Sequence, residues 1–256
     1  MNSDRNILWL LGNLTLGTLA AFLKWFVVCA IFLLVRRAGL TIVGLENLPS
    51  DKTFILVSSH QLPITAEVAI CSGALRRKIL PWAAALQESA TSSGTFWLYR
   101  HYSWGIIPIS PGANLADLDA LAERTRDELK RNNLVWVAPE GRFGYGLGVR
   151  RGFHSFIRVL RDLPEYKIVP MTVFGGDNCH WHMDIYRKHP NMTMVFGQPF
   201  QMSEHAQSSS VAEQSKATDE VMLRITSLMP ASMHGYYTGA KLGEHKYTRD
   251  VSPSDE

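Results

Sequence analysis

From residue 38 onward, short apolar runs alternate with longer amphipathic stretches. The apolar runs are three to six residues long and are bounded by Gly, Pro or Ser, which is typical of strands. Apolar residues recur at helical spacing between them, and strands that alternate with helices indicate an α/β domain. We predict strands at residues 41–43, 54–58, 105–109, 134–138, 168–173 and 193–196, and helices at residues 65–72, 114–131, 152–162 and 209–229.

Residues 114–131 show the helical period most clearly. Apolar residues recur three and four positions apart, acidic residues come early and basic residues come late, as the helix dipole favours. No chemistry is evident in this stretch, so we assign the helix to packing alone. Its apolar face consists of Leu115, Leu118, Leu121, Ala122 and Leu129, and its polar face of Asp117, Asp119, Glu123, Arg124 and Lys130.

The N-terminal residues 7–35 are apolar on the scale of a membrane segment, with Lys24 as the single charge in twenty-nine residues. A spanning helix needs about 20 apolar residues. Because Lys24 divides the run, both one tilted span and attachment to a single leaflet stay open, and a buried core helix is the alternative. Arg36 and Arg37 follow the run, and the positive-inside rule then places the remaining chain on the cytoplasmic face. We expect residues 1–38 to form a membrane anchor.

Composition excludes several classes of protein. Hydrophobic residues make up 46% of the chain and charged residues 19%, which excludes a disordered chain or a nucleic-acid-binding tail. The three cysteines are odd in number and far apart, so neither a disulfide framework nor a zinc pattern is present. A reducing compartment, or indifference to redox conditions, follows.

Charge is distributed unevenly. The net charge of +3 divides into +6 for the first 200 residues and −3 for residues 201–256. Residues 142–161 hold five arginines and no acid, which beside a membrane anchor favours an anionic head group or a phosphate as the partner. Of these arginines, Arg158 and Arg161 are expected on the outer face of a helix. Residues 231–256 are predicted to form a loose C-terminal tail.

The first candidate site follows the strand predicted at residues 54–58. Ser59 and His60 come directly after it, and Pro63 is suited to begin the next helix. Ligands bind at the carboxyl ends of strands in open α/β sheets. A histidine there can take a proton from an alcohol near neutral pH if an acceptor on its other nitrogen holds it in one tautomer.

The second candidate site follows the strand predicted at residues 134–138. It reads Pro139-Glu140-Gly141-Arg142, and four glycines occur within residues 141–148. Glycines let the backbone approach a ligand closely, and the Arg142 guanidinium can bind a phosphate with several donors. The loop lacks the Lys-Ser/Thr ending of a P-loop.

In this order, the two sites resemble the glycerolipid acyltransferases of the lysophosphatidic acid acyltransferase type, over about residues 40–200. The family's first block is a strand followed by N-H-x4-D. Here it reads Ser59-His60, with Thr65 in the place of the acid and Glu67 as the nearest carboxylate.

The family's other blocks are matched in part. The second, G-x-I-x-hydrophobic-R, is echoed at residues 105–109, with Ser110 in place of the arginine. The third, F-P-E-G-T-R-S, is matched at residues 138–142, with Ala138 in place of Phe and Arg142 one position early. Smaller matches occur at Gly152, at Val169-Pro170 and at Phe196-Gly197-Gln198-Pro199.

The resemblance implies a single acyltransferase domain at residues 39–230, with a mixed, mostly parallel central sheet flanked by helices. It implies transfer of an acyl chain from acyl-CoA or acyl-carrier protein to the hydroxyl of a lysophospholipid, in phospholipid biosynthesis or remodelling, without a bound cofactor or metal. His60 would act as the general base and Glu67 would orient it. Arg142 would hold the phosphate or head group, Glu140 and Gly141 would shape the turn, and Arg150 or Arg151 would assist.

Other interpretations are weighed against this one. Residues 179–182 contain Cys and two His, but they follow a Gly-Gly-Asp-Asn segment that favours a loop over a metal site. The aromatic residues at 97–104 favour a lipid interface, an acyl-chain wall or core packing over a nucleic-acid platform. The alternative functions are a catalytically silent lipid-binding scaffold of the same fold and a lipid or thioester hydrolase. The absence of G-x-S-x-G weighs against a serine lipase.

Overall fold

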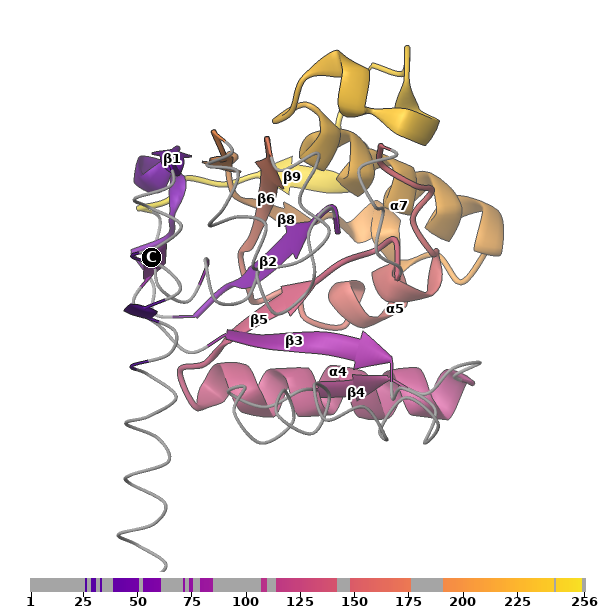
Figure 1. The fold of residues 1–256 in the computed structure, drawn as a ribbon. Coiled ribbons are helices and arrows are strands. Elements are labelled where there is room, and N and C mark those ends of the chain that lie inside the picture. The colour runs from indigo at the N-terminus through magenta and orange to yellow at the C-terminus, as the bar shows by residue number, and fades with distance from the viewer. Residues whose placement is uncertain are drawn as a thin grey trace, which may run out of the picture.

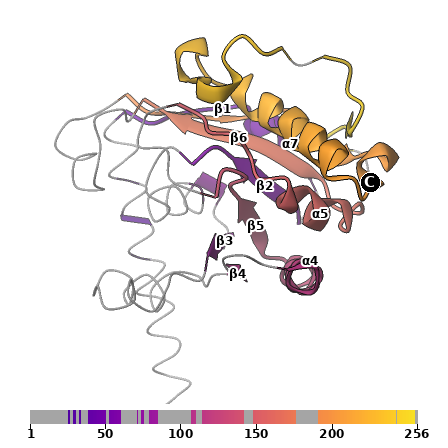
Figure 2. The ribbon, with the colours of Figure 1, turned by 90° about the vertical axis from the view of Figure 1, so that its right-hand side faces the viewer.

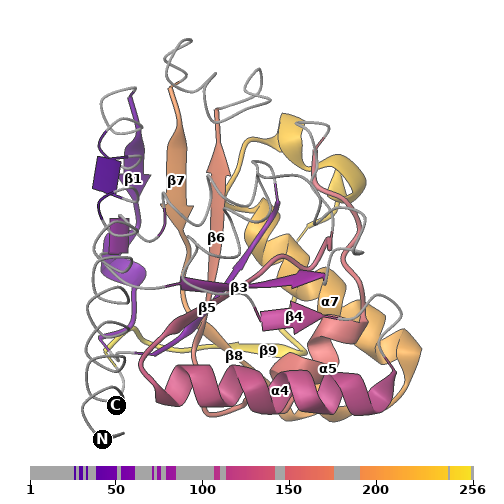
Figure 3. The ribbon, with the colours of Figure 1, turned by 60° about the horizontal axis from the view of Figure 1, so that its bottom comes forward.

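A mixed sheet forms the frame of the fold. The computed structural model describes residues 26, 29, 30, 33, 39–50, 53–60, 71, 74, 75, 79–84, 107–109, 114–141, 148–175, 191–241 and 243–254. Within these residues nine strands pair in the order β1-β7-β6-β2-β5-β3-β4, with β8 beside β6 and β9 beside β8 (Figure 1, Figure 3). The strands are β1 (Thr41–Val43), β2 (Ile55–Ser58), β3 (Ile79–Ala84), β4 (Ile107–Ile109), β5 (Leu134–Val137), β6 (Ile168–Phe174), β7 (Thr193–Phe196), β8 (Phe200–Met202) and β9 (Thr248–Asp250).

Most strand pairs are parallel. The central strand β2 is parallel to both β5 and β6, with Ile55 opposite Val135 on one side and Ile168 on the other. The pairs β1 with β7, β3 with β5 and β3 with β4 are parallel as well, whereas β6 with β7, β6 with β8 and β8 with β9 are antiparallel. The prediction of an α/β fold with a mixed, mostly parallel sheet is therefore confirmed.

All six predicted strands are present, and the sequence analysis missed three more. Strand β3 has the sequence ILPWAA. Its Pro81 argues against a strand in the sequence, because proline has no backbone N–H to donate to a neighbouring strand. Strands β8 and β9 each have three residues, and their sequences FQM and TRD contain no apolar run. Their pairing depends on neighbours that are distant in sequence.

The helices α4 (Leu115–Lys130), α5 (Ser155–Arg161) and α7 (Val211–Thr226) lie together on one face of the sheet (Figure 2). They correspond to three of the four predicted helices, and α5 and α7 are shorter at both ends than expected. The fourth prediction, residues 65–72, falls almost entirely outside the described residues. Short 3-10 helices occur at η1 (Leu45–Asn47), η3 (Glu204–Gln207), η4 (Ala231–Met233) and η5 (Gly235–Tyr237).

Helix α4 begins with a capping box. The Asn114 side chain accepts the N–H of Asp117, and the Asp117 carboxylate accepts the N–H of Asn114, which satisfies two donors at the helix start. Most of the predicted apolar face is buried. Leu115 is the exception at 62% exposure, because helical side chains tilt toward the N-terminus and the first one projects beyond the helix.

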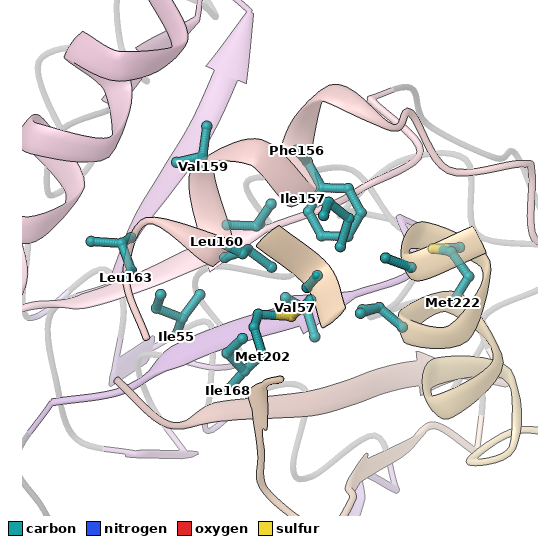
Figure 4. Close-up of a cluster of buried hydrophobic side chains, with 14 of the residues drawn as sticks. Ile55, Val57, Phe156, Ile157, Val159, Leu160, Leu163, Ile168, Met202 and Met222 are labelled. Carbon is teal, nitrogen blue, oxygen red and sulfur yellow. The ribbon is translucent and has the colours of Figure 1, made fainter. Parts of the chain in front are cut away.

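The sheet separates two apolar clusters. In β2, Ile55 and Val57 face α5 and α7, whereas Leu56 belongs to the cluster on the opposite side, so the central strand is buried on both faces. Figure 4 shows the first cluster, which includes Phe156 and Ile157 of α5 and Met222 of α7. This packing holds α5 and α7 against the sheet.

The C-terminal residues belong to the fold, which corrects the expectation of a loose tail at residues 231–256. The buried carboxylate of Glu220 on α7 accepts the backbone N–H groups of Tyr247 and Thr248, at 3.1 and 2.8 Å. Arg224 binds the Asp250 carboxylate at 2.7 Å. A carboxylate of α7 thus accepts backbone N–H groups at the start of β9 and just before it.

No helix in the part of the chain that the structure describes is long and apolar enough to cross a membrane. Of the predicted anchor, residues 1–38, that part includes only Phe26, Cys29, Ala30 and Leu33. The anchor therefore stays a prediction.

Candidate active site

The two candidate sites meet at one edge of the sheet. His60 lies two residues beyond β2, and the Pro139-Glu140-Gly141 turn follows β5, its parallel neighbour. The Glu140 Oε1 atom accepts the backbone N–H of His60 at 2.9 Å. Both segments thus lie at the carboxyl ends of paired parallel strands, where ligands bind in open α/β sheets.

Glu140 joins three segments of the chain. Its carboxylate is 1% exposed, and while Oε1 holds His60, Oε2 accepts the backbone N–H of Arg150 at 2.8 Å. Hydrogen bonds to both oxygens offset the cost of burying a charge. Both oxygens therefore accept backbone N–H groups, which agrees with a role in shaping the turn.

Gly141 holds the turn in a conformation that other residues adopt rarely. Its φ is +61°, and its N–H donates to the carbonyl of Ala138 at 3.0 Å. A Cβ atom here would lie 3.0 Å from the Phe153 ring, and the Phe153 N–H donates to the carbonyl of Pro139 at 2.9 Å. The turn is thus packed closely against the segment that leads into α5.

The imidazole of His60 lies against Trp136. The ring centroids are 5.6 Å apart, in an edge-on arrangement at 81°, and the His60 residue is partly exposed. The indole N–H of Trp136 donates to Ser58 Oγ at 2.7 Å, so the tryptophan is fixed beneath the histidine. The sequence analysis missed Trp136. Its signal is an indole N–H within the buried strand LVWV, where that donor needs a partner.

The predicted basic residues divide into two groups. Arg150 and Arg151 are exposed, and the backbone N–H of Arg150 donates to Glu140 of the turn. Arg158 and Arg161 instead bind other parts of the fold. Arg158 pairs with Asp119 of α4 at 2.8 Å, and Arg161 donates to the carbonyl of Ser208 at 2.8 Å, so both connect α5 to neighbouring segments, where the sequence analysis expected them only on the outer face of the helix.

Arg142 and Glu67 fall outside the described residues, as do the Cys-His segment at 179–182 and the aromatic residues at 97–104. Their predicted roles stay predictions. Of the seven predicted site residues, the structure describes five: His60, Glu140, Gly141, Arg150 and Arg151.

Known proteins resemble this chain in sequence profile and in fold. The profile of the Acyltransferase family matches residues 39–174, which is more than half of the chain and includes both strand-end segments. A comparison with curated proteins finds no match. Among solved structures, the crystal structure of the 1-acyl-sn-glycerophosphate (LPA) acyltransferase PlsC from Thermotoga maritima is similar in fold. It is 18% identical, the match covers 89% of this chain and 96% of that one, and the TM-score is 0.50.

The buried glutamate joins the histidine segment to the Pro-Glu-Gly turn, and the family profile spans both segments. The match to the family starts at residue 39 and includes every predicted catalytic or binding residue. The resemblance found in the sequence is confirmed: this chain belongs to the acyltransferase family.

Proposed function

We propose that this protein transfers an acyl chain from an acyl thioester to the free hydroxyl of a lysophospholipid at the cytoplasmic face of a membrane. Family membership supports acyl transfer, and the likeness in fold to an LPA acyltransferase supports a glycerolipid acceptor. The observation that carries the proposal is the pair of hydrogen bonds that the Glu140 carboxylate accepts from the backbone N–H groups of His60 and Arg150, at 2.9 and 2.8 Å.

In the proposed reaction, His60 takes the proton of the acceptor hydroxyl as its oxygen attacks the thioester carbonyl. The C–S bond then breaks, and the proton passes from the imidazolium to the departing thiolate, so no acyl-enzyme forms. A positioned general base contributes about 10²- to 10⁴-fold in rate. Backbone N–H groups beyond His60 would stabilise the oxyanion.

The imidazole needs an acceptor on its second nitrogen to keep the tautomer that can take a proton. Glu67 is the proposed acceptor, since Thr65 stands where the family's block carries its acid. The donor is proposed to be acyl-CoA or acyl-carrier protein.

Arg142, Arg150 and Arg151 are proposed to meet the phosphate of the acceptor. Guanidinium groups bind phosphate with several directed donors, and two of these three are exposed beside the Glu140 turn. The apolar residues 7–35 would hold this site at the membrane surface, where both the acceptor and the acyl chain are found.

The proposal is tested with the full chain in membranes, a labelled acyl-CoA or acyl-carrier protein, and a panel of lysophospholipids that differ in head group. Labelled diacyl phospholipid from the wild type, and its loss in His60→Ala, is the expected result. Free fatty acid as the main product would indicate a hydrolase. No product from a protein that still binds lyso-lipid would indicate a silent scaffold. Equal transfer by His60→Ala would disprove the assignment of the base.

A further inference from the structure

The segment from Gly148 to Gly152, which carries both exposed arginines, is paired with the C-terminal part of the chain. The N–H of Val149 donates to the carbonyl of Met233 at 3.0 Å, and the carbonyl of Val149 accepts the N–H of Tyr236 at 2.8 Å. These two bonds join the residue just before Arg150 to η4 and η5. Residues 148–152, the basic segment, are therefore fixed by hydrogen bonds to residues more than eighty positions later in the chain.

Two glycines make this approach close. Gly148 and Gly235 have φ values of +85° and +55°. A Cβ atom at Gly235 would lie 2.3 Å from the carbonyl oxygen of Val149, and one at Gly148 would lie 2.9 Å from the Cα atom of Gly235. Since real Cβ atoms do not approach so closely, any larger residue at either position would separate the two segments.

Tyr237 holds the other end of the segment. Its ring is buried, at 3% exposure, and its hydroxyl accepts the N–H of Gly152 at 3.2 Å and donates to Oδ1 of Asp219 at 2.9 Å. Burial raises the pKa of the Tyr237 phenol well above its usual value, so the hydroxyl keeps its proton for Asp219. Gly152 also lies tightly against α7, where a Cβ atom would be 2.6 Å from Cγ2 of Thr218.

Arg150 and Arg151 thus project from a segment whose backbone is held on both sides. Val149 is bound by η4 and η5, the N–H of Arg150 by Glu140, and Gly152 by Tyr237. The Arg151 guanidinium lies 5.6 Å from the centre of the Tyr236 ring and donates to Ser215 Oγ at 2.8 Å. A rigid backbone presents its cations without the ordering cost that a free loop would incur on binding.

We propose that the C-terminal segment Met233–Tyr237 completes the acceptor site, and that Tyr237 is a positioning residue that sets where Arg150 and Arg151 meet an anionic head group. The segment would favour acceptors with a phosphate over acceptors with an uncharged head group. The inference rests on the proposed function, because it concerns the acceptor of that reaction.

Tyr237→Phe tests the inference, with Tyr247→Phe as the matched control. Both tyrosines are buried, at 3% and 5% exposure, and both donate to a carboxylate of α7, Tyr237 to Asp219 and Tyr247 to Glu213. Only Tyr237 also accepts a hydrogen bond from the basic segment. Loss of stability alone would therefore affect both variants, whereas loss of positioning would affect only Tyr237→Phe.

For full chains in membranes, we expect Tyr237→Phe to raise the KM for lysophosphatidic acid by about three- to tenfold, the range that one lost hydrogen bond allows. Its kcat, its KM for the acyl thioester and its rate with monoacylglycerol should change less than twofold. Tyr247→Phe should leave all four unchanged. Equal KM values for lysophosphatidic acid in the two variants would overturn the inference.

A second measurement does not depend on turnover. Amide hydrogen exchange at residues 148–153 should be faster in Tyr237→Phe than in the wild type and unchanged in Tyr247→Phe, which should instead loosen residues 246–250. Unchanged exchange at residues 148–153 in Tyr237→Phe would contradict the positioning role. If the wild type transfers no acyl chain, the proposed function fails, and the exchange experiment alone decides whether Tyr237 holds the segment.

Discussion

The backbone N–H of His60 donates a 2.9 Å hydrogen bond to the carboxylate of Glu140, eighty residues later in the chain. The same carboxylate accepts the N–H of Arg150, so one buried acid sets the distance between the proposed base and the first exposed cation of the basic segment. A change in this side chain should therefore alter the positions of both His60 and Arg150.

Glu140→Gln should reduce both activity and stability. The amide nitrogen that replaces one oxygen cannot accept an N–H, so one buried donor, from His60 or Arg150, loses its partner, at a cost of about 1–3 kcal/mol in the free energy of unfolding. Displacement of the base should lower kcat/KM by about a hundredfold. Steady-state kinetics and urea unfolding measure the two effects.

Glu165→Gln is the control for that variant. Glu165 is an exposed acid that pairs with Arg126 at 3.1 Å, so its replacement should change the free energy of unfolding by about 0.5 kcal/mol or less. If Glu140→Gln matched this control in both measurements, the carboxylate would have no role in holding the site.

Gly141→Ala should impair the turn beyond the cost of backbone strain alone. A positive φ costs a non-glycine residue about 1–2 kcal/mol, and here the new methyl group also meets the Phe153 ring at 3.0 Å. Gly239→Ala is the matched control, since its φ is +79° and nothing lies within 4 Å of its Cβ position. Both variants should lose stability in urea unfolding, but only Gly141→Ala should lose acyl-transfer activity. Equal activity in the two would show that the shape of the turn is unimportant for catalysis.

Glu67→Gln tests the proposed orienting acid. An amide can still accept a hydrogen bond but does not stabilise the imidazolium, so kcat should fall by about 10²-fold or more, toward the level of His60→Ala. Acyl-transfer kinetics at saturating donor measure the change. Wild-type activity in Glu67→Gln, together with loss of activity in His60→Ala, would mean that a different acceptor orients His60.

The attachment of the C-terminal region should depend on pH through Glu213. Hydrogen bonds from Lys216, Tyr247 and Lys246 lower the pKa of the Glu213 carboxyl from 4.5 to about 2. A lowered folded-state pKa contributes stability that is complete above the unfolded value and is lost as the pH falls through the folded value. The contribution should therefore be full above about pH 5 and disappear between pH 4.5 and about 2.

Glu213→Gln lacks this contribution at every pH. Urea unfolding of both proteins should show a difference in free energy that is largest near neutral pH, shrinks below pH 4.5, and falls with added salt because the group is partly exposed. A difference that stays constant from pH 6 to pH 3 would show that the carboxylate charge does not hold this region.

Much of the site could be predicted because its residues follow buried strands. The apolar runs before His60 and Pro139 mark β2 and β5, and parallel neighbours end at the same edge of a sheet. The role of Glu140 could be anticipated only as a residue of the turn. Its acceptor oxygens bind backbone N–H groups, and a backbone N–H is present at every residue except proline, so no residue pattern identifies its partners.

The C-terminal region shows the opposite case. Residues 231–256 resemble a loose tail in the sequence, yet the N–H of Thr248 in β9 donates to Glu220 of α7, and Gly235 allows contact with Val149. The roles of these residues come from α7 and from the basic segment, which lie elsewhere in the chain. The composition of residues 231–256 alone therefore does not predict these contacts.

By itself, the sequence determined the α/β class, the main strands, helix α4, the two strand-end segments and the family, because these follow from periodicity and from short motifs. Only the tertiary structure decided that Glu140 joins His60 to Arg150 and that the C-terminal segment holds residues 148–152. The physical reason is separation along the chain. Hydrophobic periodicity is a pattern of neighbouring residues, whereas these hydrogen bonds join backbone groups that become neighbours only when the chain folds.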